Sequence, residues 1–521
     1  MKIFRNGFWQ KFLTILVILL DLGFLITLIA LLGLGALNTT YALLVLFLFW
    51  LVNFTVLVFI MNNNASSLDY NAAWLFFVGC LPLIGAVIYI LFAHKMRTKR
   101  QSKFLSKYYS IIKADQSDSY VEEKIKRDYP SSYRIMKYAE RASECHAYEN
   151  TSVEYFPLGD EVLDVMLREV KKAHHYIFIE YFIIKPGKMW NSILEVLKEK
   201  VKEGVDVRVV YDDVGNLGAT PVHYDQVLRS YGIKARIFNK IRPMVDIRVN
   251  NRDHRKIFVI DGHTCFTGGI NLADEYINQE VRFGHWKDNC IMIKGKAVYG
   301  FTLLFLSAWI CYYDSKATIS YNYYKPETFI DEDNGFPRSD GYVQAYADVP
   351  YSDYSCGLGV YTSLLGNAKN YVYISTPYLI PDEKIKNALK MAALSGVDVR
   401  IITPHIPDKK AVFMLTRKNY GQLLKAGVKI YEYTPGFIHQ KMFVADDNVA
   451  TIGTMNLDYR SLFLHMENGT LLIGNSSIQS MKQDFLNTIE VSEEITMEKW
   501  KKMRNKYGFF WYLLNLFAPL L

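Results

Sequence analysis

One eight-residue pattern occurs twice in the carboxy-terminal part of this chain. His254-Arg-Lys256-Ile-Phe-Val-Ile-Asp261 returns as His439-Gln-Lys441-Met-Phe-Val-Ala-Asp446, and each copy is followed at the same distance by a short loop that ends in Asn271 or Asn456. Side chains alternate along a strand, so the histidine and lysine of each copy share one face, whereas the aspartate has the opposite parity and lies at the turn that ends the strand. We therefore expect two related units that bring two histidines, two lysines and two asparagines to one site.

The likeness between the two units extends to the amino-terminal side of each motif. In each unit a strand pattern, a helical pattern and a second strand pattern follow one another, at 175–180, 193–201 and 204–211, and again at 370–375, 384–393 and 396–402. The pentapeptide Gly-Val-Asp-Val-Arg occurs in both copies. Strands that alternate with helices predict an α/β fold with two pseudo-symmetric units that share one site, each built on a largely parallel sheet.

Two acids also keep the same spacing in both units. Alignment of 467–474 on 288–295 places Glu467 and Asp288 at one distance before a glycine. A carboxylate at this position would hold an imidazole in one tautomer through its second ring nitrogen, and an ordinary surface acid is the alternative. Six of the nine histidines outside the duplicated motif are interpreted as structural: His174, His175, His223, His285, His405 and His465.

Two imidazoles, two ammonium groups and two amides suit a phosphodiester. Lysine ammonium groups neutralise its non-bridging oxygens as charge builds up in the transition state. One histidine can attack phosphorus, while the other protonates the leaving alkoxide and later deprotonates an acceptor alcohol. This chemistry needs neither a metal nor a cofactor, and the six cysteines show no Cys-x-x-Cys spacing that would indicate a zinc site.

The first ninety or so residues are far more apolar than the rest of the chain. Apolar runs occupy 12–37, 41–61 and 74–93, and each is long enough as a helix to cross a hydrocarbon core of about 30 Å. Six basic residues follow between Lys95 and Lys107, with no acid among them. Positive charge beside a span favours the cytoplasmic side, so we expect three transmembrane helices and a cytoplasmic catalytic body. Bases at the amino terminus also favour the inside, which leaves two spans as an alternative and the side of the amino terminus open.

These patterns divide the chain into five regions. The membrane region takes residues 1–94, and a basic linker with connecting helices takes 95–150. The two repeat units take 151–340 and 341–495. The tail, 496–521, combines five bases with an apolar end, which is typical of an amphipathic helix in the membrane interface; a helix packed on the body is the alternative.

At these residues the chain resembles the phospholipase D superfamily, which is marked by two His-x-Lys-x4-Asp motifs, and more narrowly the bacterial cardiolipin synthases. The narrower resemblance extends from about residue 41 to the end and rests on further segments: Trp74 to Ala93, Tyr211-Asp-Asp-Val-Gly215, Thr376-Pro-Tyr-Leu-Ile-Pro-Asp382, Gly436-Phe-Ile-His439 and Asn456-Leu-Asp-Tyr-Arg-Ser461. The chain departs from that family in three places: Asp253 stands where the family usually has Asn, Met455 replaces a small residue, and the run 12–37 is additional.

The resemblance implies transfer of a phosphatidyl group from one phosphatidylglycerol to another through a phosphatidyl-histidine intermediate, with release of glycerol. It implies His254 as the nucleophile and His439 as the general acid and base, although pseudo-symmetry lets the two roles exchange. The expected site comprises the catalytic residues His254, Lys256, Asp261, His439, Lys441 and Asp446, the substrate-binding residues Asn271 and Asn456, and the supporting acids Asp288 and Glu467. The expected partners are phosphatidylglycerol and anionic membrane lipids, and the expected location is the bacterial cell membrane, as a multi-pass protein.

Other functions are compatible with the same motifs. Hydrolysis of a phospholipid, or transfer to another alcohol such as serine, would differ only in the group that reaches the intermediate. A nuclease would use the same phosphodiester chemistry, but the apolar runs and the lack of an interleaved basic and aromatic strip beyond residue 150 argue against a nucleic-acid partner. An inactive membrane scaffold would tolerate a broken motif, and both motifs are intact.

Overall fold

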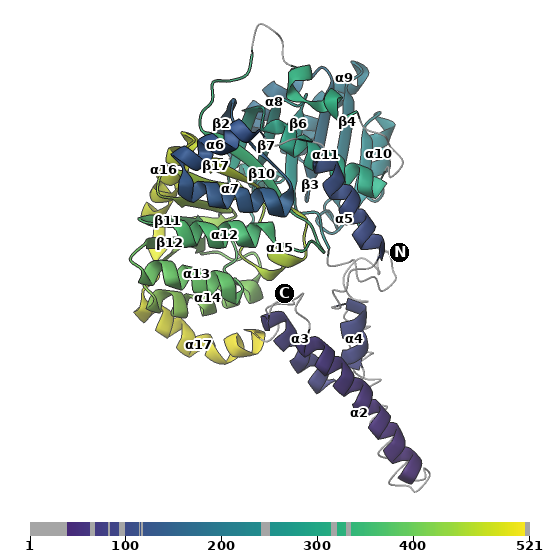
Figure 1. Ribbon diagram of the computed structural model, residues 1–521, viewed down its shortest axis with the longest axis vertical. Coiled ribbons are helices and arrows are strands. Elements are labelled where there is room, and N and C mark those ends of the chain that lie inside the picture. Colours follow the sequence, from purple (N-terminus) through teal and green to yellow (C-terminus); the bar gives the residue numbers. More distant parts are fainter. Residues whose placement is uncertain are drawn as a thin grey trace. The chain divides into compact units, whose positions relative to one another are not determined.

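The structure is a computed structural model (Figure 1), and it describes residues 39–62, 68–81, 84–92, 99–113, 115, 118–240, 251–313, 320–329 and 335–515. The chain divides into two compact units. The first contains Met1–Arg97, Ile241–Asn250 and Tyr512–Leu521, and the second contains Thr98–Lys240 and Asn251–Trp511. Both copies of the repeated motif belong to the second unit, which is called the body below.

The described helices of the first unit are α2 (Thr39–Met61), α3 (Leu68–Cys80) and α4 (Ile84–Phe92). Of the predicted apolar runs, 41–61 lies in α2, 74–93 is divided between α3 and α4, and 12–37 lies outside the described residues. With 13 and 9 residues, α3 and α4 are shorter than a hydrocarbon core of about 30 Å at 1.5 Å per residue. Among the helices that the structure describes, none has both the length and the apolar character that a membrane crossing needs, so the predicted transmembrane helices are not found there.

The first half of the body is built on a mixed sheet. Its described strands, in spatial order, are β2 (Thr151–Phe156), β9 (Cys290–Gly295), β7 (Thr264–Gly268), β6 (Lys256–Ile260), β3 (Tyr176–Tyr181), β4 (Asp206–Asp212) and β5 (Lys234–Phe238). β3, β4 and β5 run parallel, but β6, β7, β9 and β2 join through antiparallel pairs. The prediction of a largely parallel sheet is therefore wrong, because the motif strand β6 turns back directly into β7 and such a short connection joins antiparallel strands.

The second half repeats this arrangement. Its described strands, in spatial order, are β1 (Ala147–Tyr148), β10 (Tyr342–Asp348), β17 (Glu467–Ile473), β16 (Val449–Gly453), β15 (Met442–Ala445), β11 (Tyr371–Ser375), β12 (Asp398–Pro404), β13 (Lys429–Tyr433) and β18 (Ser492–Glu494). Only β11, β12 and β13 are mutually parallel among these strands. The predicted β-α-β order is present in both halves, with α9 (Lys188–Lys202) between β3 and β4 and α13 (Glu383–Leu394) between β11 and β12, so the α/β fold is confirmed.

Helices cover the faces of both sheets and leave the motif strands in the interior. Over the second sheet, α7 (Pro130–Ser143), α12 (Cys356–Asn367) and α13 lie side by side, as Figure 1 shows. The remaining large helices of the body are α5 (Lys99–Ile112), α6 (Ser119–Asp128), α8 (Val162–Lys171), α10 (Tyr224–Ser230), α11 (Val298–Tyr313), α14 (Lys410–Lys425) and α16 (Ser477–Glu490). One apolar cluster contains Ile257 and Val259 of β6, Val444 of β15 and residues of α5 and α11, so the two sheets share a core. Every residue of β6 and β15 is buried, which holds the start of each motif strand rigidly.

The segments at the two ends of the body pack on the rest of it through buried residues. In the segment predicted as a linker, α5 packs on α11, and β1 pairs with β10 in the second sheet. At the other end, α17 (Met497–Asn515) buries Trp500, whose indole Nε1–H donates to the carbonyl of Arg417 at 2.9 Å. This part of the tail is a helix packed on the body, while Phe509 and Phe510 remain exposed.

Candidate active site

Backbone hydrogen bonds join the two halves of the body at the motif histidines. His254 lies just before β6, and its N–H donates to the carbonyl of Met466 at 2.9 Å. His439 lies just before β15, and its N–H donates to the carbonyl of Lys287 at 2.7 Å. Met466 and Lys287 directly precede Glu467 and Asp288 in the sequence. Each motif histidine is therefore set beside the acid that belongs to the opposite half.

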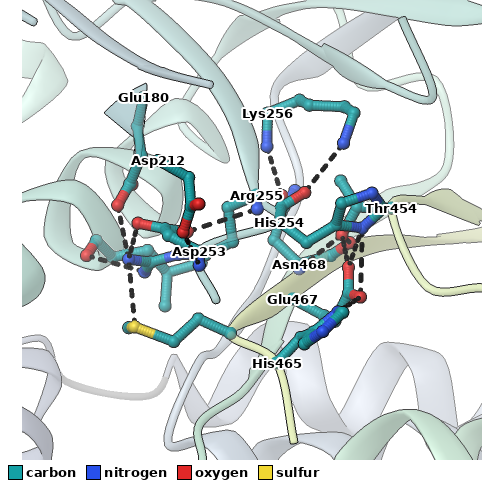
Figure 2. Close-up of polar contacts among 12 residues, drawn as sticks. Glu180, Asp212, Asp253, His254, Arg255, Lys256, Thr454, His465, Glu467 and Asn468 are labelled. Carbon is teal, nitrogen blue, oxygen red and sulfur yellow. Dashed lines mark hydrogen bonds and ion pairs between the residues drawn. The ribbon is translucent and has the colours of Figure 1, made fainter. Parts of the chain in front are cut away.

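The two histidine–carboxylate pairs are crossed between the halves. Nδ1 of His254 donates to Glu467 of the second half, at 2.9 and 3.1 Å from the two carboxylate oxygens (Figure 2). Nδ1 of His439 donates to Asp288 of the first half at 2.6 Å. Because each Nδ1 is engaged, Nε2 is the ring nitrogen left for chemistry in both cases. Glu467 also accepts a hydrogen bond from the Thr454 hydroxyl, which fixes the carboxylate.

Burial controls the protonation of the two motif histidines and the two motif lysines. It is the largest cause that lowers the pKa of His254 to about 3 and of His439 to about 4, while Glu467 and Asp288 act in the opposite direction. Burial likewise lowers the pKa of Lys256 to about 8 and of Lys441 to about 7. Lys256 contributes to the lowered pKa of both His439 and Lys441 through its charge, so the two motifs form one electrostatic site. Lys256 Nζ donates to the carbonyl of His254 at 2.8 Å, and Lys441 Nζ donates to that of His439.

The motif aspartates lie at the turns that end the motif strands. Asp261 accepts hydrogen bonds from the N–H groups of three successive residues, His174, His175 and Tyr176, at 2.7, 2.9 and 2.7 Å. Asp446 does the same for Lys369, Asn370 and Tyr371 at 2.6, 2.8 and 3.0 Å. Both aspartates have a positive φ, 47° and 51°. The structure thus gives Asp261 and Asp446 a bracing position at the strand end away from the imidazoles, in agreement with their parity in the sequence.

The two motif asparagines differ in their contacts. Asn271 uses both ends of its amide within the protein, since its oxygen accepts from the Ile183 N–H at 3.1 Å and its nitrogen donates to the Tyr276 hydroxyl at 2.6 Å. Asn456 is buried, and its amide oxygen has no hydrogen-bond partner among the described residues. Asn456 is therefore the better placed of the two amides for contact with a ligand, and Asn271 braces the loop after β3.

His465, interpreted from the sequence as structural, lies beside His254. Their ring centroids are 5.9 Å apart, and His465 Nδ1 is 3.6 Å from the Glu467 carboxylate (Figure 2). A third imidazole thus shares the acid that holds His254. The missed signal was its position two residues before Glu467, which puts both side chains on one face of an extended chain.

A buried ionic cluster lies beside His254 (Figure 2). Arg255 is fully buried and forms ion pairs with Glu180 and, at 3.1 Å, with Asp253. Burial raises the pKa of Glu180 well above its usual value, and burial also raises the pKa of the nearby Asp212 to about 7. The departure at Asp253 therefore has a structural role, because this carboxylate neutralises the arginine of its own motif.

Among the described residues, His254, His465 and Glu467 are the group whose ligand atoms could surround a metal ion, since these atoms lie within 4.8 Å of one another. Two imidazoles and a carboxylate match the ligand types of zinc. The ammonium group of Lys256, whose charge acts directly on His254, opposes a divalent cation at this place.

The chain is similar to known proteins over most of its length. A family model described as "Cardiolipin synthase, PLD-like domain" matches residues 166–300 and 361–489, one match in each half. An uncharacterised protein of Streptococcus mutans is 40% identical over 465 residues, which are 89% of this chain and 99% of that protein. Cardiolipin synthase 2 of Bacillus anthracis is 34% identical over 467 residues, with 89% and 88% of the two chains covered. Cardiolipin synthase of Halalkalibacterium halodurans is 32% identical over 469 residues, with 89% and 91% covered.

Among solved structures, phosphatidylserine synthase of Haemophilus influenzae has the same fold. It superposes with a TM-score of 0.53 at 16% identity, and the match covers 74% of this chain and all of that one (100%). The family model alone spans both motifs and both crossed acids. The chain belongs to the phospholipase D-like family of bacterial cardiolipin synthases.

Proposed function

We propose that this protein is a cardiolipin synthase, which transfers the phosphatidyl group of one phosphatidylglycerol to a second and releases glycerol. The observation that carries the proposal is the pair of crossed histidine–carboxylate contacts flanked by Lys256 and Lys441. Family membership supports the choice of a phospholipid as the substrate.

In the first half-reaction, Nε2 of His254 attacks phosphorus and the bond to the glycerol headgroup oxygen breaks. Glu467 supports this step by holding Nδ1–H of His254, which keeps Nε2 unprotonated and stabilises the positive ring that forms. His439 gives its proton to the leaving oxygen. A phosphodiester anion beside His439 favours the protonated imidazole, so substrate binding itself supplies the acid.

In the second half-reaction, the neutral His439 takes a proton from a hydroxyl of the second phosphatidylglycerol. The oxygen of that hydroxyl attacks phosphorus, and the bond from phosphorus to His254 breaks. Lys256 and Lys441 counter the charge on the non-bridging oxygens in both steps. Asn456 is proposed as the substrate-binding amide, because its amide oxygen has no hydrogen-bond partner among the described residues. Asp261 and Asp446 are proposed to brace the turns that end the motif strands.

We further propose that the amino-terminal region holds the enzyme at the cell membrane, with the catalytic body on the cytoplasmic side. Helix α2 exposes large apolar side chains, among them Tyr41, Phe47 and Trp50, which are 68%, 59% and 58% exposed. An exposed apolar surface of this kind requires a covering, and lipid chains would supply it. Protease digestion of the body in inverted but not in right-side-out membrane vesicles would support this orientation, and the reverse pattern would contradict it.

The function is tested by incubation of the purified full chain with phosphatidylglycerol in an uncharged detergent, with chelator present, followed by mass spectrometry of the products. Cardiolipin and free glycerol are expected. Phosphatidic acid and glycerol would instead indicate hydrolysis and overturn the transferase assignment. The matched controls are His254→Ala, which we expect to be inactive, and His174→Ala, which removes an exposed imidazole and should leave the activity unchanged.

A further inference from the structure

A basic cavity of about 560 Å³ lies in the first half of the body, at the open edge of its sheet. Its main lining residues are Arg208 of β4, Arg229 of α10, Lys234 and Arg236 of β5, and Trp309 and Tyr313 of α11. None of them belongs to the motif site. The volume is within the range of sites for small ligands, which is about 300–1,000 Å³.

The cavity carries more positive than negative charge. Asp206 binds Arg208 at 2.7 Å and Lys234 at 2.8 Å, and Asp225 binds Arg229 at 2.7 Å. Three of the four cavity bases are thus paired with only two acids. The guanidinium of Arg236 forms no hydrogen bond or ion pair with another residue in the described part of the chain. Arg236 is exposed on β5 and lines the cavity.

Aromatic side chains form the floor of the cavity and hold the bases in place. The buried ring of Trp309 contacts two guanidinium groups, with Arg208 Cζ at 5.4 Å and Arg236 Cζ at 5.9 Å from its centroid. The hydroxyl of Tyr313 is buried and has no hydrogen-bond partner among the described residues. This hydroxyl is within electrostatic reach of the buried acids Asp253, Glu180 and Asp212, so Tyr313 contributes its ring, and not its hydroxyl, to the cavity wall.

The second half of the body differs at the corresponding place. It keeps the ion-pair trio, since Asp398 binds Arg400 at 2.7 Å and Lys429 at 2.9 Å. The repeat places Tyr431 where the first half has Arg236, and β18 covers this edge of the sheet with Glu494 opposite Tyr431. The open, basic edge is therefore a property of the first half alone among the described strands, and the fold does not require it.

We propose that this cavity binds a phosphate group, carried by a lipid headgroup or free in solution, at a place separate from the motif histidines. Guanidinium groups that are held against an aromatic ring suit the oxygens of phosphate, which accept paired hydrogen bonds. Arg236 and Lys234 are the bases that approach the phosphate from the exposed side, and Trp309 holds the guanidinium groups of Arg208 and Arg236.

The test is hydrogen–deuterium exchange of the full chain in an uncharged detergent, because it reports on the peptide around 229–238 without reference to activity. The probes are inorganic phosphate, soluble dihexanoyl phosphatidic acid and, as a zwitterionic comparison, dihexanoyl phosphatidylcholine, all at one ionic strength. We expect phosphatidic acid to slow exchange in this peptide at least about threefold, because a bound ligand suppresses local opening. Protection by inorganic phosphate as well would identify the free ion as sufficient, whereas protection by phosphatidic acid alone would identify a lipid headgroup.

Paired variants decide whether the protection arises in the cavity. Arg236→Gln and Lys234→Gln should remove it, whereas Lys429→Gln, at the repeat-related position in the second half, should leave it unchanged. An ionic strength of about 1 M, where the screening length is about 3 Å, should also remove it. The proposal is overturned if neither inorganic phosphate nor phosphatidic acid slows exchange, or if Arg236→Gln and Lys234→Gln are protected as well as the wild type.

Discussion

The two halves of the body hold their motif histidines in the same way but support them with different residues. His254 lies beside the Arg255 cluster with Glu180 and Asp253. In the second half Gln440 replaces Arg255, and its amide donates to Asp484 at 3.0 Å. Asp484 accepts two further hydrogen bonds, from Lys287 and from Tyr155, both at 2.7 Å.

This difference shows which parts of a duplicated site are free to change. The motif histidines and lysines, which would contact a phosphodiester, keep the same spacing in both halves, because the two halves must act on the same phosphorus atom. The supporting groups are free to change, provided that each buried charge keeps a partner, since an unpaired buried charge costs several kcal/mol. The rings also have unequal surroundings, because His254 contacts Phe182 and His465, whereas His439 lies among Tyr276, Trp286 and Phe437.

Removal of either motif histidine should have the largest effect. His254→Ala and His439→Ala should each lower cardiolipin formation by about 10³–10⁴-fold, since each loses a step of nucleophilic or proton-transfer catalysis. The two variants should differ in covalent labelling by phosphatidylglycerol with a radioactive phosphate. Label should remain on His439→Ala, which lacks the base that activates the acceptor, and not on His254→Ala; the opposite pattern would exchange the two assigned roles.

The exchange Arg255→Gln, which gives the first half the residue of the second, should lower the free energy of unfolding by about 3–5 kcal/mol. The reason is that Glu180 and Asp253 would remain buried without their cation. Urea denaturation followed by circular dichroism measures the loss. Lys502→Gln breaks an exposed ion pair with Glu498 and serves as the control, and an equal effect of both variants would rule out the special cost of the buried cluster.

Acid should destabilise the body through both buried imidazoles. In the unfolded chain a histidine titrates near 6.5, whereas the pKa values of His254 and His439 are about 3 and about 4 in the folded protein. Between these values the unfolded state binds two more protons, so stability falls as pH falls, by up to about 2.7 kcal/mol per pH unit below pH 6. Unfolding free energies measured from pH 7 to pH 5 should show this slope, and the double variant His254→Asn, His439→Asn should show a smaller one.

Loss of the crossed carboxylates should have a smaller effect on turnover. Glu467→Gln and Asp288→Asn should each lower kcat by about 10–100-fold with little change in KM, because the acid orients the ring and does not bind the substrate. Asp261→Asn and Asp446→Asn provide the comparison, since they brace turns and should mainly lower thermal stability. If all four substitutions lowered kcat equally, the crossed pairs would have no distinct role.

His465→Asn should have the smallest effect, a decrease in kcat of about threefold, well below the effect of removing an acid or base. His465 Nδ1 is 3.6 Å from the carboxylate that holds His254, so its loss changes the surroundings of one imidazole and leaves both crossed pairs intact. The expected signature is a shift in the pH profile of kcat with KM unchanged. His405→Asn, which affects an imidazole paired with Glu432, should leave the profile in place.

Several elements were predictable from local pattern. The strand expected at 175–180 is β3, Tyr176–Tyr181, and the strand expected at 396–402 overlaps β12, Asp398–Pro404. Parity also placed Asp261 and Asp446 at turns. The direction of the motif strands was not predictable in this way, because an apolar run has the same appearance in a parallel and an antiparallel pair. The predicted transmembrane helices are not found among the described helices, and the apolar run 74–93 is divided there between α3 and α4.

The sequence alone determined the duplicated α/β unit, the chemical groups of the site and their spacing, because those follow from repeat alignment and from the two-residue period of a strand. Tertiary structure decided which acid serves which histidine. Alignment pairs Glu467 with Asp288 as equivalents, but only the backbone contacts of His254 with Met466 and of His439 with Lys287 bring Glu467 to His254 and Asp288 to His439. It also decided that His465 joins the site and that Arg236 borders an open cavity. These outcomes depend on contacts between distant segments, such as Arg236 with Trp309 or the cover that β18 gives to β13, and local sequence does not specify which distant segments meet.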